Sequence, residues 1–348
     1  MPDKNKSVLS RRSVLDLGAK AAGAVALSSL LEGAPLRPAA ERACVCIYLV
    51  GGNDSNNMLV PLDAGQAEAY ASGRGSLALS PASLLPVRAP ATSLNYGFHP
   101  ALQGIQELYN RGLLAVVANV GRMDEPLTKG QFSAQQLPAD LFQHAGASQV
   151  SYRPQGRMAI GWDAESTSLS SPTVPVTNNG ISLRQQLFGL ITRFRNGGTK
   201  GTYMATMSGF DSHRDQLDRQ ASLFTELNDG LTSFCEELER LGLISRVLVY
   251  TATEFNRTLA PNANRGTDHA WGGHHLVFGG PVRGGEVFGR FPSLQPGGPD
   301  DLGTNGIWIP SISDTQLAAT IAQWYGVSNL AAAFPNLSKF PEREVGFL

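Results

Sequence analysis

The chain has 348 residues with a formal net charge of -1 at pH 7, and only 16% of its residues are charged. Nucleic-acid-binding proteins usually carry a basic surface, so this balance excludes nucleic acid as the expected partner. The 38 glycines and 21 prolines predict many connecting loops, which is usual for an α/β enzyme whose functional residues lie on loops.

The first 40 residues have the three parts of a removable export signal. Arg11 and Arg12 form the basic start, a weakly apolar stretch follows over residues 17–31, and small residues close the segment near 38–40. Paired arginines are typical of the twin-arginine pathway. We therefore expect the twin-arginine translocation machinery as a partner and a periplasmic or extracellular mature protein. The alternative is an ordinary amphipathic N-terminal helix.

The same stretch does not predict a stable membrane span in the mature form. Lys20 interrupts it, and a span needs roughly 20 consecutive apolar residues. We therefore divide the chain into a signal, residues 1–40, and one domain, residues 41–348. A domain of that length can bury one large core.

The three cysteines do not predict a metal site of their own. Cys44 and Cys46 stand two apart on an expected strand, so they point to the same face and are poorly placed for a mutual disulfide. We expect all three to be buried as small apolar residues. A disulfide from Cys235 to one of the first two is the alternative in an oxidising compartment.

In chain order, the apolar pattern alternates between strands and helices. Residues 45–50 and 113–120 are continuous apolar runs followed by glycine, as expected of strands buried on both faces. Residues 99–111 have helical apolar spacing. The later expected strands are residues 201–207, 246–251 and 275–278, and the later expected helices are residues 182–195, 216–243 and 314–325. This alternation predicts a mostly parallel sheet with right-handed crossovers.

Polar clusters follow the apolar runs, where parallel strands are expected to end. In such sheets the functional residues gather in loops beyond the carboxyl ends of the strands. The clusters are residues 51–57, 209–213, 253–258 and 267–275, and they hold four of the six histidines. We therefore expect these loops to form one site.

The clusters contain the residue types that bind zinc, manganese and iron, because carboxylates supply oxygen and neutral imidazole supplies nitrogen. The candidates are Asp54, Asp211, His213, Glu254, Asp268, His269, His274 and His275, of which one of the last two is expected to face away. Each has a simpler explanation when taken alone, such as a helix cap for Asp54. His99, ahead of a proline at a helix start, is expected to be structural.

In this order, these residues resemble the family called domain of unknown function 1501, whose members look like distant relatives of alkaline phosphatase and the sulfatases. The resemblance covers nearly all of the mature chain. It is carried by the twin-arginine leader, Gly-Gly-Asn-Asp at 51–54, Tyr-Gly-Phe-His-Pro at 96–100, Phe-Asp-Ser-His at 210–213, Thr-Glu-Phe-Asn-Arg-Thr at 253–258, Asp-His at 268–269 and Gly-Gly-Pro-Val-Arg-Gly-Gly at 279–285.

The resemblance implies an alkaline-phosphatase-like three-layer sandwich, an α/β fold whose mostly parallel central sheet has helices on both faces. It also implies divalent metal ions (zinc, manganese, calcium or iron), with Asp54 as an early strand-end ligand. The other implied ligands are Asp211, His213, Glu254, Asp268, His269 and His274. A nucleophilic Ser or Thr beside the metals would attack phosphorus or sulfur.

One departure from the family pattern concerns the nucleophile. The family often has Phe-Ser-His where residues 142–144 of this chain read Phe-Gln-His, and Gln143 cannot act as that nucleophile. Ser55, Thr128 or Ser133 would have to substitute, unless the motif never held the nucleophile or covalent catalysis has been lost.

The function expected on this basis is an exported, metal-dependent hydrolase of phosphate or sulfate esters. Besides Ser55, the expected catalytic residues are Arg257, which would hold the substrate anion by paired hydrogen bonds, and Asn57, which would donate to a developing oxyanion. The alternative is a non-catalytic cell-envelope protein that keeps the hydrolase fold for assembly or binding, which Gln143 favours. A third option is an oxidase or a carbohydrate-processing enzyme on the same scaffold.

Overall fold

The computed structural model describes residues 41–132, 137, 141–144, 161–162, 169–170, 174–175, 180–280 and 282–348. Residues Arg42–Leu348 form one compact unit. The expected export signal, residues 1–40, and Ser133 lie outside the described residues. Within the described part, no helix combines the length and the hydropathy needed to cross a membrane.

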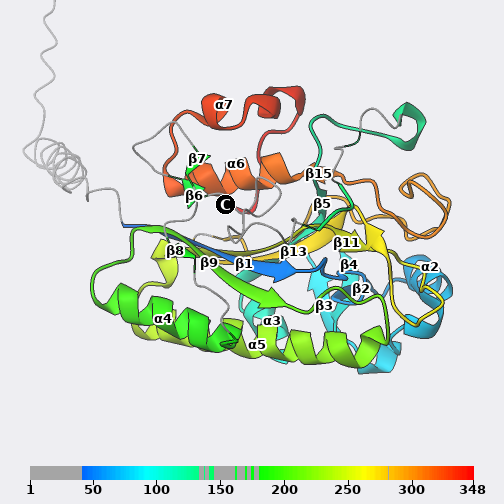
Figure 1. Cartoon of the computed structure of the whole chain (residues 1–348), viewed down its shortest axis with the longest axis horizontal. Coiled ribbons are helices and arrows are strands. Elements are labelled where there is room, and N and C mark those ends of the chain that lie inside the picture. Colours follow the sequence, from blue (N-terminus) through cyan, green and yellow to red (C-terminus); the bar gives the residue numbers. More distant parts are fainter. Residues whose placement is uncertain are drawn as a thin grey trace, which may run out of the picture. The chain divides into compact units, whose positions relative to one another are not determined.

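An eight-stranded mixed sheet forms the centre of this unit (Figure 1). Its strand order is β14 (Val287–Phe288), β5 (Leu114–Gly121), β13 (Gly273–Gly279), β10 (Val247–Thr253), β1 (Ala43–Val50), β9 (Gly201–Ser208) and β8 (Val174–Pro175), with β15 (Ile312–Ser313) also paired to β5. Every pairing is parallel except the two made by β13. The predicted mostly parallel sheet is confirmed.

Helices cover both faces of the sheet, which confirms the predicted three-layer arrangement. Figure 1 shows α3 (Gln103–Asn110), α4 (Leu183–Arg195) and α5 (Gln216–Arg240) on one face, and α6 (Asp314–Tyr325) on the other with α7 (Leu330–Ala333) beyond it. Successive side chains of β1 point to opposite faces of the sheet and so pack into both cores. Val45 and Ile47 join the core under α3 to α5, whereas Cys46 and Tyr48 join the core under α6.

The predicted long elements agree closely with the observed ones. α6 occupies the residues expected, because Ser313 and Gln316 form a capping box at its start and Gly326, with a φ of 113°, follows its end. α5 ends three residues before the prediction, where Gly242 takes a φ of 67°. β13 was predicted as a strand and is one, but it runs antiparallel to its neighbours.

A second layer of small elements has no counterpart in the predictions. The strands β2 (Leu59–Pro61), β4 (Leu94–Phe98) and β3 (Leu85–Ala89) form a separate sheet beside α2 (Ala64–Arg74). Only Tyr70 and Arg74 of α2 are buried, so its sequence has no apolar stripe to mark it as a helix. The remaining short strands are β6 (Gly161–Trp162), β7 (Leu169–Ser170), β11 (Asn256–Arg257) and β12 (His269–Ala270), and the 3-10 turns are Gly75–Leu77, Pro81–Ser83, Lys129–Gln131, Ile244–Arg246 and Pro335–Lys339.

All three cysteines are buried and free, as predicted. Cys44 and Cys46 lie in the core under α6, whereas Cys235 lies in the core on the opposite face of the sheet. The sheet therefore separates Cys235 from both partners, and the alternative disulfide is absent from this structure.

His99 has the structural role expected of it. Its ring is 5% exposed, packs edge-on against Phe224 and accepts a hydrogen bond at Nδ1 from the backbone nitrogen of Ala101, 3.1 Å away. An accepting Nδ1 requires the unprotonated form at that nitrogen. Burial accordingly lowers the pKa of His99 from 6.5 to about 4.

This shift predicts an acid-sensitive fold. Between pH 6.5 and 4 the unfolded chain binds a proton at His99 that the folded chain does not. The free energy of unfolding therefore decreases as the pH is lowered through this window, by roughly 3 kcal/mol for this residue. In His99→Asn, where the side-chain oxygen replaces Nδ1 as acceptor, the loss in the free energy of unfolding between pH 7 and pH 4 is expected to be smaller by about that amount. Urea unfolding at both pH values measures it, and equal losses in the two proteins would contradict the prediction.

Candidate metal centre

Four strands bring polar loops to one edge of the central sheet. β1, β9 and β10 are parallel to one another, so their carboxyl ends meet there. Because β13 runs antiparallel to β10, its amino end reaches the same edge. The loops that carry Asp211, Arg257 and His269 therefore come into contact.

Asp211, His213, His269 and His144 face one another and are here called the histidine cluster. His213 Nε2 lies 3.1 Å from Asp211 Oδ1 and 3.1 Å from His269 Nε2. His144 Nε2 lies 3.5 Å from Asp211 Oδ2. Potential ligand atoms of His144, Asp211 and His269 all lie within 4.8 Å of one another.

Two of the rings are oriented by acceptors at their far nitrogen. His213 Nδ1 is 3.0 Å from Asp268 Oδ1, and His269 Nδ1 is 2.7 Å from the carbonyl oxygen of Phe142. Each Nδ1 must carry the proton to donate to these acceptors, so each neutral ring presents a lone pair at Nε2. Metal-binding histidines are usually held by such carboxylate and backbone acceptors.

The Nε2 atoms of His213 and His269 lie 3.1 Å apart, and His213 Nε2 is also 3.4 Å from Nη1 of Arg257. In the tautomers described above, a cation or a shared proton between the two Nε2 atoms would stabilise this arrangement. Three imidazoles and a carboxylate match the nitrogen and oxygen ligands of a tetrahedral zinc site, and manganese and iron accept the same donors. The donor set therefore fits one transition-metal ion held by His144, Asp211, His213 and His269.

The protonation states at neutral pH suit this role. Burial raises the pKa of Asp211, but the hydrogen bond and charge of Arg257, with smaller effects of His213 and His144, outweigh burial and lower that pKa. Burial lowers the pKa of His269, and the charge of Arg257 lowers it further, whereas the hydrogen bond to the Phe142 carbonyl acts in the opposite direction. Asp211 is therefore ionised and His269 neutral at pH 7.

Arg257 is buried beside the cluster and its donors are engaged. Nε donates to the Gly52 carbonyl and Nη1 to the Thr267 carbonyl, each at 3.1 Å. Nη2 donates to the Gly51 carbonyl and, at 2.6 Å, to Asp211 Oδ1. A substrate clamp would need two of these donors, so the contacts favour a positioning role for Arg257.

Asp54 lies apart from the cluster in a buried ion pair with Arg74. Its Oδ2 also accepts from Gln216 Nε2, and its Oδ1 accepts from the backbone and side-chain nitrogens of Asn56 at 3.0 and 3.1 Å. A guanidinium group thus neutralises the carboxylate for which a metal ion was expected. We leave Asp54 out of the proposed ligand set.

Glu254 and Asp268 border the cluster without joining its ring of facing atoms. Glu254 Oε2 accepts from the backbone nitrogens of Gly51 and Gly52 at 2.9 and 3.2 Å, so it orders that turn. Asp268 orients His213 from behind. These contacts favour supporting roles for both carboxylates.

His274 is buried away from the cluster. Its Nδ1 accepts from the backbone nitrogen of Asn119 at 3.1 Å, and its ring stacks on Phe291 with centroids 4.4 Å apart. Burial, followed by the neighbouring His275, lowers its pKa to about 3, so it is neutral. These contacts favour a structural His274.

The predicted nucleophile and oxyanion donor are also committed to internal hydrogen bonds. Ser55 Oγ, 1% exposed, lies 3.1 Å from Asn256 Oδ1 and accepts from the backbone nitrogen of His274 at 2.8 Å. Asn57 is fully buried and binds Tyr70 and Arg74 through its side-chain oxygen. Neither residue faces the histidine cluster.

His144 is the site residue that sequence reasoning missed. It belongs to the stretch 142–144, in which only Gln143 was considered because it stands where a nucleophile was expected. The structure places His144 against Asp211 and edge-on to His269, with ring centroids 4.7 Å apart. The sequence did contain a signal for it: the family often has Phe-Ser-His at residues 142–144, and this chain keeps the histidine although Gln143 replaces the serine.

Residues 192–325 match the model of the family described as Protein of unknown function (DUF1501), which confirms the predicted family over that segment. No curated protein sequence matches the chain. Solved structures with similar folds include the lipoteichoic acid synthase LtaP of Listeria monocytogenes, at 7% identity and a TM-score of 0.40 over 85% of this chain and 74% of that one.

Two further similar structures span comparable shares of the chain. The C-terminal periplasmic domain of EcEptC from Escherichia coli, a complex with Zn, has 8% identity and a TM-score of 0.38 over 83% of this chain and 84% of that one. A protein in the alkaline phosphatase superfamily from Vibrio parahaemolyticus has 8% identity and a TM-score of 0.36 over 87% and 71%.

The cluster predicts that the full chain, purified without chelators, holds about one transition-metal ion by elemental analysis. The metal is expected to be lost in His269→Ala and Asp211→Ala. Asp268→Asn, which removes the negative charge that orients His213, should weaken metal affinity about 10- to 100-fold. His99→Asn is the matched control, because it removes a buried histidine outside the cluster. No bound metal in the wild type would contradict the assignment.

The Asp54–Arg74 pair predicts a large stability effect. Arg74→Met leaves a buried carboxylate without its counter-ion, so the free energy of unfolding is expected to fall by about 3–5 kcal/mol. Arg265→Met breaks an ion pair with Asp215 that is largely exposed on both sides, and its urea midpoint should stay near that of the wild type. Similar midpoints in the two variants would show that the buried pair is not the anchor inferred here.

Proposed function

We propose that this chain, whose residues 192–325 belong to the family of unknown function described above, is an exported hydrolase of phosphate or sulfate esters that uses one metal ion. The observation that carries the proposal is the pair of facing, oriented Nε2 atoms of His213 and His269 beside the Asp211 carboxylate. Export in folded form accords with a site that receives its metal before transport.

A divalent ion held by the cluster would supply a Lewis acid for an anionic ester oxygen and would lower the pKa of a bound water. The chain itself contributes charge and rigidity. Arg257 is 0% exposed and keeps Asp211 in place, and its positive charge adds to the attraction of anions. Asp268 and the Phe142 carbonyl fix the rings of His213 and His269.

Water is the nucleophile in this proposal. Gln143 has no nucleophilic hydroxyl, and the Ser55 hydroxyl is enclosed by Asn256 and His274. A covalent intermediate on Ser55 would require breaking both contacts. Hydrolysis by water needs neither residue, so it accords with the substitution of the expected serine at position 143.

The test is turnover of aryl phosphate and aryl sulfate esters by the mature protein, with manganese or zinc supplied. We expect a metal-dependent rate that falls by at least about 100-fold in His269→Ala and Asp211→Asn. In Ser55→Ala the rate should remain within about threefold of the wild type, because Ser55 does not attack the ester. A wild-type rate no higher than that of His213→Ala under every metal would refute hydrolysis.

The second candidate is a non-catalytic cell-envelope protein that keeps the hydrolase fold. Two observations favour it: Arg74 neutralises Asp54, and the donors of Arg257 bind the chain itself. Retained metal without turnover of any ester, together with a co-purifying partner, would support this candidate over the first.

A further inference from the structure

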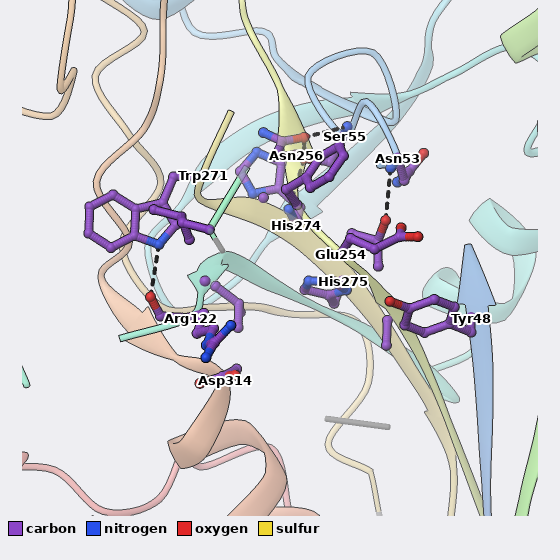
Figure 2. A pocket seen from close by; sticks show the side chains of 17 residues that line it. Tyr48, Asn53, Ser55, Arg122, Glu254, Asn256, Trp271, His274, His275 and Asp314 are labelled. Atoms are coloured by element: carbon purple, nitrogen blue, oxygen red, sulfur yellow. Dashed lines mark hydrogen bonds between the residues drawn. The ribbon is translucent and has the colours of Figure 1, made fainter. Parts of the chain in front are cut away.

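A polar pocket lies behind the metal centre, at the carboxyl ends of β1 and β10 on the side of the sheet that α6 covers. Its lining includes Tyr48, Glu254, Phe255 and His275 (Figure 2). Phe255 separates it from the histidine cluster, because the ring of His269 stacks on Phe255 with centroids 4.0 Å apart. The proposed hydrolysis does not use this pocket, although Ser55, Glu254 and His274 contribute to its lining.

The hydroxyl of Tyr48 is the first sign of a ligand. Tyr48 is 2% exposed, and its buried hydroxyl has no hydrogen-bond partner among the described residues. Figure 2 shows this hydroxyl directed toward Glu254 and His275. A buried hydroxyl without a partner costs free energy, so its retention calls for a partner from outside the chain.

Glu254 supplies the charge at this end of the pocket. Its Oε2 accepts from the backbone nitrogens of Gly51 and Gly52, whereas no described residue donates to Oε1. Burial first, and then the Glu254 charge, raise the pKa of Tyr48 well above its usual value, so the phenol stays protonated next to an anion. The carboxylate therefore lacks a charged donor on one oxygen.

No cationic side chain occupies this end among the described lining residues. Burial lowers the pKa of His275 to about 4, so its ring is neutral at pH 7. Arg122 lies at the opposite end of the view in Figure 2, beside Asp314. The end that contains Tyr48 and Glu254 thus offers acceptors and negative charge, with Ala252 and Phe255 as apolar walls.

We infer that this pocket binds the primary ammonium group of a small organic molecule, through the Glu254 carboxylate and the Tyr48 hydroxyl. A charge-assisted hydrogen bond to a carboxylate is roughly twice as strong as a neutral one, which favours an ammonium over an alcohol. The ammonium would donate one hydrogen bond to Glu254 Oε1 and one to the Tyr48 oxygen. The site requires no metal, so it does not depend on the proposed hydrolysis.

The test is a ligand-observed NMR titration of the full chain with ethylammonium chloride, performed with and without chelator. We expect saturable binding in both conditions, and affinity weakened by about tenfold in Tyr48→Phe and by more in Glu254→Gln, which turns the free acceptor into a donor. Tyr250→Phe is the matched control, because Tyr250 lies in the same core but does not line this pocket, and it should bind as the wild type does.

Two comparison probes and one stability measurement complete the test. Tetramethylammonium carries the charge without N–H donors, and ethylene glycol carries donors without charge, so both should bind more weakly than ethylammonium. The Tm of unliganded Tyr48→Phe should equal or exceed that of the wild type, since the lost hydroxyl has no partner. Absent binding, equal binding of ethylene glycol, or unchanged affinity in Glu254→Gln would each overturn the inference.

Discussion

The buried guanidinium of Arg257 is the interaction on which the edge of the sheet depends. It joins the turn after β1, through the carbonyls of Gly51 and Gly52, to the loop before β12, through the Thr267 carbonyl, and to Asp211 after β9. The turn admits no side chain, because a Cβ on Gly51 would lie 2.4 Å from the Asp211 backbone nitrogen and φ there is 111°. One planar group with five donors can tie three loops in a way that a lysine cannot.

A second buried arginine fixes the other half of this edge. Arg74 reaches from the end of α2 to Asp54, Asn57 and the carbonyls of Thr258 and Leu259. The small sheet and α2 are thereby attached to the loops that surround the centre. The two aspartates therefore have different roles: Asp54 stabilises the scaffold, whereas Asp211 lies beside the histidines and is available as a ligand.

Along this edge of the sheet, polar groups that form hydrogen bonds within the chain belong to the scaffold, whereas buried polar groups without such bonds mark candidate binding sites. Ser55, Asn57 and Arg257 have their donors and acceptors engaged within the chain. The exceptions along this edge include the Tyr48 hydroxyl, Asn53 Oδ1 and His274 Nε2, which all line the pocket beside Phe255 and have no hydrogen-bond partner among the described residues. A folded chain that leaves such groups without partners has given up stability there, which is usual at functional sites and unusual in a core.

The sequence by itself determined the long strands and helices, because their apolar periodicities and helix caps are local properties. It also determined the loops in which most site residues lie, since polar clusters stand next to the expected strands: Asp211 follows β9 and His269 precedes β13. Only the tertiary structure decided which of these side chains meet. Asp54 looks like a ligand until Arg74, 20 residues away on a helix without an apolar stripe, is seen to neutralise it. His144 looks incidental until the fold sets it against Asp211. The physical reason is that coordination and ion pairing depend on distances of a few ångströms between loops far apart in the chain, which no local pattern records.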